Sequence, residues 1–532
     1  MGRRSSTPQF QNPLLVNPKV NFSKILSRHT MKMGGEFQTI HTEILDFSPQ
    51  YGSDSYSGQF SRSSGAANTI YNVADFLYGA RSSYSLANTV VVDYRQRMNF
   101  FYYQDDWKVN RKLTLNLGLR YEYATPQWEA KNRLANFDAA ALKLIQAPGG
   151  GIYERALVRP DRNNWAPRFG FAYSPTPKTA LRGGYGISYI HFNRMGGENI
   201  LSYNGPTVIN ASVSQLPASP ICAGDQGSPS CFRPTMMGFP PNMVVPEKFS
   251  TLISRTNHIP ADYRTSYVQS WHFTIQRELG RGWVADLAYV GNRGVGLMIL
   301  GDYNQARPNN VGEKTVLQAR RPFSAFTEIQ IAWGGGFSTY HGLQTKVEKK
   351  FSGGMYFLNS FTWSKSIDNA AGHLETAAGD NSRVNFRDLG NEKGLGSYNQ
   401  PLNNTTTLVY DLPYGKGRRF GSSANAWAGG IAGGWRLTLI NTMTSGMPVN
   451  LTYGPTSQFS VSGSPAYRPN ITGDPMAPVS QRSIDNYFNK DNVQLPTDTR
   501  FPFGNAGRNI ARGYSFHNLD MGLHKDFPVW TE

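Results

Sequence analysis

The clearest alternation of apolar and polar positions in the chain runs through residues 98–123. In its second half, one face carries Leu113, Leu115, Leu117, Leu119, Tyr121 and Tyr123, and the other carries Thr114, Asn116, Gly118, Arg120 and Glu122. This period of two predicts a β-strand. Residues 100–107 are equally β-prone, and only residues 109–112 separate the two runs, so together they predict a tight antiparallel hairpin.

The arms of this hairpin are long. Each has about ten residues, compared with about five or six in most soluble strands and about 9–11 in a tilted strand that crosses a bilayer. An aliphatic middle that ends in tyrosines also suits a lipid-facing stripe running into an interfacial aromatic girdle. Taken alone, the pattern fits an amphipathic hairpin of a soluble β-sandwich equally well.

Further runs of the same kind predict a chain built mainly of strands. The predicted strands span residues 21–31, 36–46, 84–94, 166–173, 180–190, 264–279, 283–291, 326–333, 339–351, 355–366, 404–412, 435–445 and 513–527. The first two are expected to meet at a turn over residues 33–35, which include two glycines. Residues 70–78 fit either a short helix or a strand.

Short and long connections alternate along the chain. Tight turns are predicted near residues 110, 175, 280 and 353, and long loops are centred near residues 145, 228, 310 and 384. Bacterial outer-membrane barrels show the same asymmetry, with short periplasmic turns and long extracellular loops. We therefore predict an all-β fold, an antiparallel transmembrane β-barrel of roughly 15–18 strands. A soluble, lectin-like β-module does not explain the alternation.

The composition is compatible with this fold. The 532 residues include 54 Gly, 28 Tyr and 30 Phe, only 17% are charged, and the mean hydropathy is −0.45. No uninterrupted apolar run reaches the roughly 18 residues that a transmembrane helix needs. The net charge of +17 comes from Lys and Arg scattered over strand ends and loops, without a dense basic run or a nucleic-acid motif. We interpret it as a solvated rim and lumen, and expect no nucleic-acid binding.

Two further features concern the compartment. Cys222 and Cys231 are the only cysteines, and they lie close together in a polar loop that contains Gly and Pro. Such a pair favours a small disulfide formed in an oxidising compartment, with two unpaired thiols as the alternative. Residues 1–20 lack the apolar core of a signal peptide. Because an outer-membrane protein needs one, either the membrane interpretation is wrong or Met1 is not the natural start.

Compact catalytic signatures are absent from the sequence, which has no HExxH, GxSxG or P-loop motif and no GxGxxG after a strand. The nine histidines are dispersed, and two cysteines without a nearby His are too few for a zinc site. Asp105 and Asp106 are adjacent on a strand and point to opposite faces, so they cannot cooperate as acid and base. We expect them to cap the hairpin near its periplasmic rim. We predict that the chain is not an enzyme and holds no cofactor or metal.

Six passages resemble TonB-dependent outer-membrane receptors of the Oar-like type, which bear a carboxypeptidase-regulatory domain. They are FFYYQDDWKVNRKLTLNLGLRYEY (100–123), NNWAPRFGFAYSP (163–175), LRGGYGISY (181–189), SYVQSWHFTIQRELGRGWVADLAYVGNRG (266–294), YHGLQTKVEKKFSGGMYFLNSFTWSKSID (340–368) and GNAGRNIARGYSFHNLDMGLHKDF (504–527). Their joint order is more specific than any one of them. The resemblance implies a barrel similar to those of siderophore and glycan transporters, with about 22 strands around a plugged lumen.

A complete member of that family has further parts. A signal peptide, often an immunoglobulin-like extension, a TonB-contacting segment and a plug precede its barrel, and its last strand closes with an aromatic residue. We therefore expect residues 1–532 to be a partial barrel domain without signal peptide, plug and final strands. An unclosed wall leaves two strand edges unpaired, which hydrocarbon does not tolerate. We expect that this polypeptide alone does not form a stable, sealed pore.

Our leading hypothesis is the barrel of a TonB-dependent transporter in the outer membrane of a Gram-negative bacterium, for uptake of a scarce siderophore, glycan or peptide. Four residues are predicted to face the lumen: Arg120, Glu122, Arg182 and Arg436. The loops near 192–263 and 367–400 are expected to form the binding mouth. The implied partners are outer-membrane lipid or lipopolysaccharide, an extracellular ligand, and the TonB energy-coupling complex through a plug outside this chain. The alternative is a surface protein for adhesion or protein secretion, with the barrel as anchor.

Overall fold

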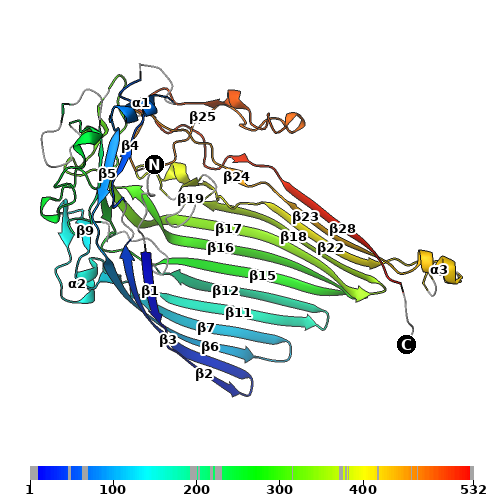
Figure 1. The fold of residues 1–532 in the computed structure, drawn as a ribbon. Coiled ribbons are helices and arrows are strands. Elements are labelled where there is room, and N and C mark those ends of the chain that lie inside the picture. Colours follow the sequence, from blue (N-terminus) through cyan, green and yellow to red (C-terminus); the bar gives the residue numbers. More distant parts are fainter. Residues whose placement is uncertain are drawn as a thin grey trace.

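The computed structural model of the protein is organised around a large curved sheet (Figure 1). The structure describes residues 10–45, 49–62, 70–191, 201, 204–215, 220–221, 231–313, 315–370, 376–377, 380–381, 383–415, 418–423, 425–456, 458–463 and 465–527. The sheet formed by these residues has 17 strands, and its long strands follow one another as an antiparallel meander. The predicted all-β fold and its approximate strand number are therefore confirmed.

The long strands pair with their neighbours in chain order. They are β2 (Lys19–Leu26), β3 (His29–Leu45), β6 (Val92–Lys108), β7 (Leu113–Ala124), β11 (Trp165–Thr176), β12 (Thr179–Ile190), β15 (Ser266–Gly280), β16 (Trp283–Asp302), β17 (Ile329–Ser352), β18 (Met355–Asp368), β22 (Leu402–Asp411), β23 (Trp435–Thr444) and β28 (Phe516–Lys525). The C-terminal part of β3 pairs with β1 (Phe10–Val16). Strands β1 and β2 therefore form one edge of the sheet, and β28 forms the other.

Short elements occupy the connections. The strands among them are β4 (Ser53–Ser55), β5 (Ser83–Ala87), β8 (Trp128–Glu129), β9 (Ala135–Asp138), β10 (Lys143–Gln146), β13 (Asn210–Ser214), β14 (Thr256–His258), β19 (Thr376–Ala377), β20 (Asp380–Asn381), β21 (Gly394–Leu395), β24 (Pro448–Val449), β25 (Asn470–Ile471), β26 (Val493–Gln494) and β27 (Ala511–Arg512). The α-helices are α1 (Tyr71–Leu77), α2 (Ile152–Ala156) and α3 (Ala426–Ala432).

One face of the sheet is apolar. Residues paired across antiparallel strands lie on the same face, so the register carries a face from strand to strand. One such row contains Leu115, Phe171, Phe273 and Tyr289. Large side chains on this face stay partly exposed, for example Phe169 at 47% and Leu287 at 45%. We call it the apolar face, and such a surface suits contact with lipid.

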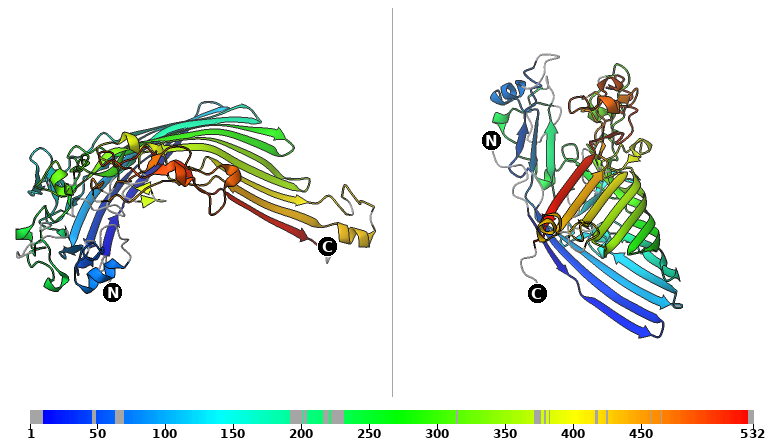
Figure 2. Two further views of the ribbon diagram at one scale, coloured as in Figure 1. Left: turned by 90° about the horizontal axis from the view of Figure 1, so that it is seen from above. Right: turned by 90° about the vertical axis from the view of Figure 1, so that its right-hand side faces the viewer.

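The opposite, polar face is concave. One row on it contains Asn116, Gly170, Gly184 and His272. Val92 and Tyr94 of β6 share a buried cluster with Met298 and Leu300 of β16, although four strands lie between β6 and β16. The sheet must therefore curve around this cluster, and Figure 2 shows it as an open trough.

Turns and loops gather at opposite ends of the sheet (Figure 1). The hairpins β6–β7, β11–β12, β15–β16 and β17–β18 turn within a few residues at one end, and the long connections lie at the other. The predicted alternation is thus confirmed, with one exception: the connection between β22 and β23, residues 412–434, lies at the turn end and contains α3. We call the long connections at the opposite end the loop layer.

The edges of the sheet stay unpaired. Within the ranges given above, β1 and β2 pair only with β3, and β28 pairs only with β23. No helix in those ranges is long and apolar enough to span a membrane.

The predicted turn at residues 33–35 is wrong. Strand β3 passes through Gly34 without a break, and the turn between β2 and β3 lies at Ser27 and Arg28. A Cβ on Gly34 would lie 2.5 Å from the carbonyl oxygen of Val20 and 2.7 Å from the Tyr102 ring. Close packing, rather than a change of chain direction, therefore requires a glycine at this position.

Other predicted boundaries also change. The strand predicted over residues 84–94 is divided between β5 and β6, and the two strands predicted over 326–333 and 339–351 are parts of β17. Residues 70–78, compatible with a helix or a strand, contain α1. In the loop layer, β5 lies between β4 and β13 in a three-stranded sheet. This sheet has its own buried core, which includes Tyr84, Ile209 and Val213.

Candidate functional site

A row of alternating charges crosses the polar face close to the loop layer. Arg120 Nε donates to Glu122 Oε1 at 2.7 Å, and Glu122 Oε2 lies 2.8 Å from His191 Nε2. On the other side, Arg120 lies 3.9 Å from Glu36, which contacts Lys19 Nζ at 3.0 Å. We call these five residues the charge ladder. Each of its carboxylates has a basic neighbour on either side.

The charge ladder runs from open solvent to a covered position. The Lys19 side chain is 53% exposed, whereas the Glu122 and His191 side chains are 9% and 8% exposed. The ladder therefore passes from the trough to the underside of the loop layer. Paired charges on a concave surface keep it hydrated without a large net field, which suits the wall of an aqueous passage.

Arg182 and Arg436 lie on the polar face outside the charge ladder. The Arg182 guanidinium donates to Gln276 Oε1 at 3.3 Å, and Arg436 Nε donates to Asp411 Oδ1 at 2.7 Å. Of the four residues predicted to face a lumen, the structure thus brings Arg120 and Glu122 together and holds the other two apart. Their role in a passage stays a prediction.

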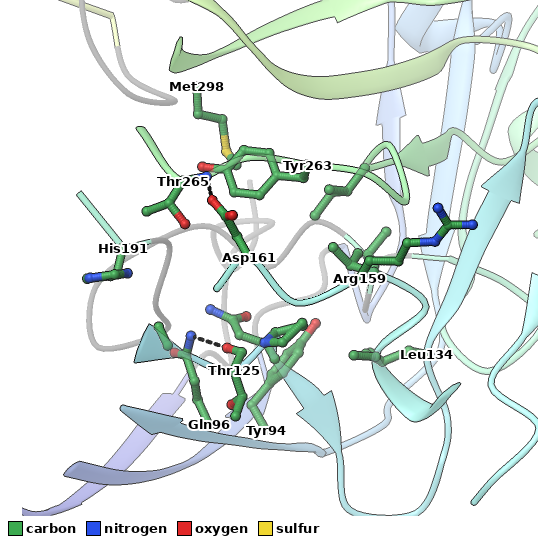
Figure 3. A pocket seen from close by; sticks show the side chains of 17 residues that line it. Tyr94, Gln96, Thr125, Leu134, Arg159, Asp161, His191, Tyr263, Thr265 and Met298 are labelled. Carbon is green, nitrogen blue, oxygen red and sulfur yellow. Dashed lines mark hydrogen bonds between the residues drawn. The ribbon is translucent and has the colours of Figure 1, made fainter. Parts of the chain in front are cut away.

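A small cavity lies between the charge ladder and the loop layer (Figure 3). Tyr94 and Gln96 from β6, Met298 from β16 and His191 after β12 form its wall. Loop residues, among them Asp161, complete the lining (Figure 3).

Hydrogen bonds hold in place the loop residues that cover this cavity, which we call its cover. Asp161 accepts from the backbone N–H of Thr265 at 2.8 Å and from Arg264 at 3.0 Å. Gln96 Nε2 donates to the carbonyl oxygen of Thr125 at 2.9 Å. Burial raises the pKa of the Tyr263 hydroxyl, so this group stays protonated at neutral pH. The cover is therefore an ordered part of the fold.

The size of the cavity limits what it can hold. Its volume is about 70 Å³, which is enough for a few water molecules. Gln127 Nε2, which lines it, is buried without a hydrogen-bond partner in the part of the chain that the structure describes. The cavity therefore suits a few water molecules, and a siderophore or an oligosaccharide does not fit in this conformation.

A larger recess of about 490 Å³ lies on the polar face nearer the turn end. Glycines line it, among them Gly118, Gly170, Gly184 and Gly186. Arg168 lies two residues from Gly170 on β11, and Arg182 lies two residues from Gly184 on β12. Among the described residues, no carboxylate lies within 4.0 Å of either guanidinium. The recess is thus more electropositive than the charge ladder and suits a neutral or anionic polar solute.

The neighbouring carboxylates Asp105 and Asp106 point to opposite faces, as predicted. Asp105 Oδ2 lies 2.6 Å from His29 Nδ1 on the apolar face, whereas Asp106 Oδ1 accepts from Asn116 Nδ2 at 2.6 Å on the polar face. They therefore act separately. No three His, Cys, Asp or Glu side chains within the described ranges form a metal-binding group.

Some predicted features fall on residues that the structure does not describe. Cys222 is one of them, so its pairing with Cys231 stays a prediction. The loops near 192–263 and 367–400 are described in part, and their role as a binding mouth stays a prediction as well.

Sequence reasoning missed His191. Alternation along β12 would place it on the face opposite Arg182, the apolar face. The strand ends at Ile190, however, and His191 lies against Glu122. Only the path of the chain after the strand brings it there.

A comparison with known protein families identifies the type of domain. A family model described as outer membrane beta barrel domain matches residues 1–532. Among solved structures, the outer membrane transporter YddB from Escherichia coli matches with 11% identity and a TM-score of 0.44, covering 84% of this chain and 44% of that protein. The siderophore receptor PirA from Acinetobacter baumannii matches with 10% identity and a TM-score of 0.41, covering 97% and 48%.

The chain spans less than half the length of either solved protein. A search of curated proteins found no match.

Proposed function

The chain belongs to the outer membrane beta barrel domain family and is located in the outer membrane, and on this premise we propose that it forms the wall of a TonB-dependent transporter. The transporter takes up a scarce polar solute of the siderophore, glycan or peptide class. The subtype that the sequence resembles, the Oar-like receptors, is part of this proposal.

The observation that carries the proposal is the contrast between the two faces. The apolar face exposes Phe169 and Leu287 to the surroundings, whereas the polar face holds the charge ladder and the recess of about 490 Å³. A transmembrane wall with lipid on one side and water on the other requires this division. The recess offers Arg168 and Arg182 to a passing solute.

The loop layer bears on how such a solute would enter. The cavity between it and the charge ladder is too small for the solute, and the hydrogen bonds of Asp161 hold its cover in place. Passage therefore requires a part of the protein to move. Energy supplied through TonB, as the family resemblance implies, would drive that movement.

Uptake by whole cells tests the proposal. Cells with and without the gene are given radiolabelled ferric siderophores and oligosaccharides, with and without a protonophore. We expect uptake of at least one of these solutes to require both the gene and the proton gradient. Gene-independent uptake of every solute, or uptake that the protonophore does not affect, contradicts the proposal.

Two variants test whether the solute passes through the recess. Arg168→Gln together with Arg182→Gln is expected to slow uptake of an anionic solute several-fold, because the recess loses its cationic groups. Lys346→Gln is the matched control: Lys346 lies on the polar face, but Glu348 neutralises it at 2.7 Å. Equal rates in both variants would remove the recess from the route.

A surface protein for adhesion or protein secretion is the second candidate, favoured by one feature of the loop layer. Side chains on and near α1 are largely exposed although they are apolar: Ile70 at 72%, Leu77 at 76%, Tyr78 at 84% and Met236 at 91%. Exposed apolar patches commonly mark sites of protein contact. Replacing Leu77 and Tyr78 by serine is expected to abolish cell adhesion under this hypothesis, and to leave solute uptake unchanged under the first.

A further inference from the structure

The connection between β22 and β23 departs from the pattern of the turn end. The neighbouring hairpins reverse direction within a few residues there, whereas β22 and β23 are separated by 23 residues, of which 412–415, 418–423 and 425–434 are described and include α3. Figure 1 shows α3 beyond the ends of the strands, at the same end as the short turns. In an outer-membrane barrel this is the periplasmic side.

Helix α3 exposes its largest apolar side chains. Trp427 is 84% exposed and Ile431 is 71% exposed, and Phe420 in the same connection is 48% exposed. Their neighbours leave them in contact with solvent instead of a protein core. Exposed aromatic and aliphatic side chains at the end of a membrane-spanning wall need another apolar environment.

The helix is joined to the apolar face. Trp435 begins β23 and pairs with Lys525. It lies two residues before Leu437, which pairs with Leu523, so both residues are on the apolar face. Trp435 Nε1 donates to the carbonyl oxygen of Ile431 at 2.9 Å. The exposed side of α3 therefore continues the surface that faces lipid.

Cationic groups accompany these apolar side chains. Arg418 and Arg419 are exposed, and the Arg419 guanidinium lies 5.4 Å from the Phe420 ring. Lys525 Nζ lies 4.9 Å from the Trp435 ring. No carboxylate of the described residues pairs with either arginine within 4.0 Å.

The acidic groups near α3 do not cancel this charge. Asp411 pairs with Arg436 on the polar face at 2.7 Å, and Asp526 is exposed beside Lys525. Arg418 and Arg419 thus present their charge next to the apolar side chains of Phe420 and α3.

We propose that residues 418–423 and 425–434 form an interfacial foot that binds the anionic phospholipid surface of the periplasmic leaflet. Trp427 and Ile431 enter the boundary between headgroups and acyl chains, where tryptophan is favoured. Arg418 and Arg419 bind lipid phosphates, because negatively charged headgroups attract basic residues that lie beside a membrane-inserted apolar surface. Continuity with the apolar face and the unneutralised arginines favour a lipid surface over a soluble protein as the occupant.

A fluorophore at position 427 tests the proposal. Protein purified from outer membranes carries Trp427→Cys in a Cys222→Ser/Cys231→Ser background, is labelled with an environment-sensitive dye, and is placed in nanodiscs of phosphatidylcholine with or without phosphatidylglycerol. We expect blue-shifted emission and roughly twofold stronger quenching by headgroup-bound nitroxide lipid when phosphatidylglycerol is present. The matched control is Ile484→Cys in the loop layer, where Ile484 is 90% exposed; it should show neither effect.

The arginines provide the second test. Arg418→Gln/Arg419→Gln should abolish the dependence on phosphatidylglycerol, and native mass spectrometry of the unlabelled variant should show several-fold less retained phosphatidylglycerol. Unchanged heat-modifiable gel mobility confirms that the wall is intact. Emission at position 427 that matches position 484, or that is the same in both lipid mixtures, overturns the proposal. So does a shift that occurs only after a soluble periplasmic extract is added.

Discussion

The sheet and the loop layer hold their charged residues in different ways. On the polar face away from the loop layer, the ion pair of Lys346 and Glu348 stays accessible, with side chains that are 44% and 27% exposed. The loop layer contains a buried ion pair: the side chains of Arg468 and Glu392 are 1% and 4% exposed, and Nη1 of the arginine lies 2.9 Å from Oε2 of the glutamate.

This difference separates two sources of stability. Exposed ion pairs contribute at most about 1 kcal/mol, so the stability of the sheet depends mainly on the backbone hydrogen bonds between its strands. Removing one partner of a buried pair costs about 3–5 kcal/mol because it leaves the other charge unpaired. The loop layer therefore behaves as a folded unit with its own polar core, and not as a set of independent loops.

The largest expected effect concerns the two edges of the sheet. Since β1, β2 and β28 each leave one side unpaired in the described structure, the 532-residue polypeptide should give no discrete, long-lived conductance in a planar bilayer. The loop layer does not depend on closure, so its amides should remain protected from hydrogen exchange. A stable single-channel conductance would show that the sheet closes in lipid.

Arg468→Ala is expected to have the next largest effect. Besides Glu392, the arginine donates to the carbonyl oxygens of Asn391 at 2.8 Å and Ala506 at 3.2 Å. Its loss should destabilise the loop layer by about 3–5 kcal/mol, measured as faster hydrogen exchange there and not in the sheet. Arg500→Ala is the control, because the Arg500–Asp498 pair is exposed. Equal hydrogen exchange in both variants would mean that the buried pair does not stabilise the loop layer.

Acid should weaken the loop layer through His258. This side chain lies between Phe137 and Tyr303, and burial lowers its pKa to about 4. The pKa in the unfolded chain is about 6.5, so stability falls as pH drops from about 6.5 towards 4, by about 2 kcal/mol at pH 5. The measurement is hydrogen exchange at pH 7 and pH 5. His258→Gln should remove this part of the acid sensitivity, and the same pH dependence in that variant would exclude His258 as its source.

Glu122→Gln tests the junction of the two regions. The substitution keeps the shape of the side chain but removes the charge that Arg120 and His191 share. We expect a loss of about 1.5–2 kcal/mol, at the low end of the range for a hydrogen bond to a charged group, measured by urea unfolding in detergent micelles. A larger loss, close to that of Arg468→Ala, would place Glu122 within the core of the loop layer.

The smallest effect is expected at Lys346→Ala in the sheet. Its partner Glu348 stays solvated on the polar face, so stability should change by no more than about 1 kcal/mol. The same urea titration measures it. A loss of several kcal/mol would show that the polar face is less hydrated than its exposure indicates, and would reduce the contrast between the two regions.

Much of the sheet could be predicted from the sequence, because the pattern of a strand is local. The hairpin β6–β7 and the shared face of Arg120 and Glu122 follow from alternation with a period of two. Glycine is less informative, since it serves both turns and close packing. The prediction at residues 33–35 failed for this reason: Gly34 makes room for Val20 and Tyr102.

The candidate site was predicted only in part. The sequence indicated which way Arg120, Glu122, Arg182 and Arg436 point, but not that Glu36 and His191 join the first two in a ladder. Nor did it indicate the recess, because its depth depends on glycines that the register aligns on neighbouring strands.

By itself, then, the sequence determined the fold class, the two faces and the alternation of turns and loops, since each depends on steric preferences within a few residues. Only the tertiary structure decided the pairing of Arg468 with Glu392 across 76 positions, the contact of Glu122 with His191 across 69, and the place of α3 beside Trp435. Such contacts form between side chains that no local pattern links, and burial in the folded chain determines which of them persist.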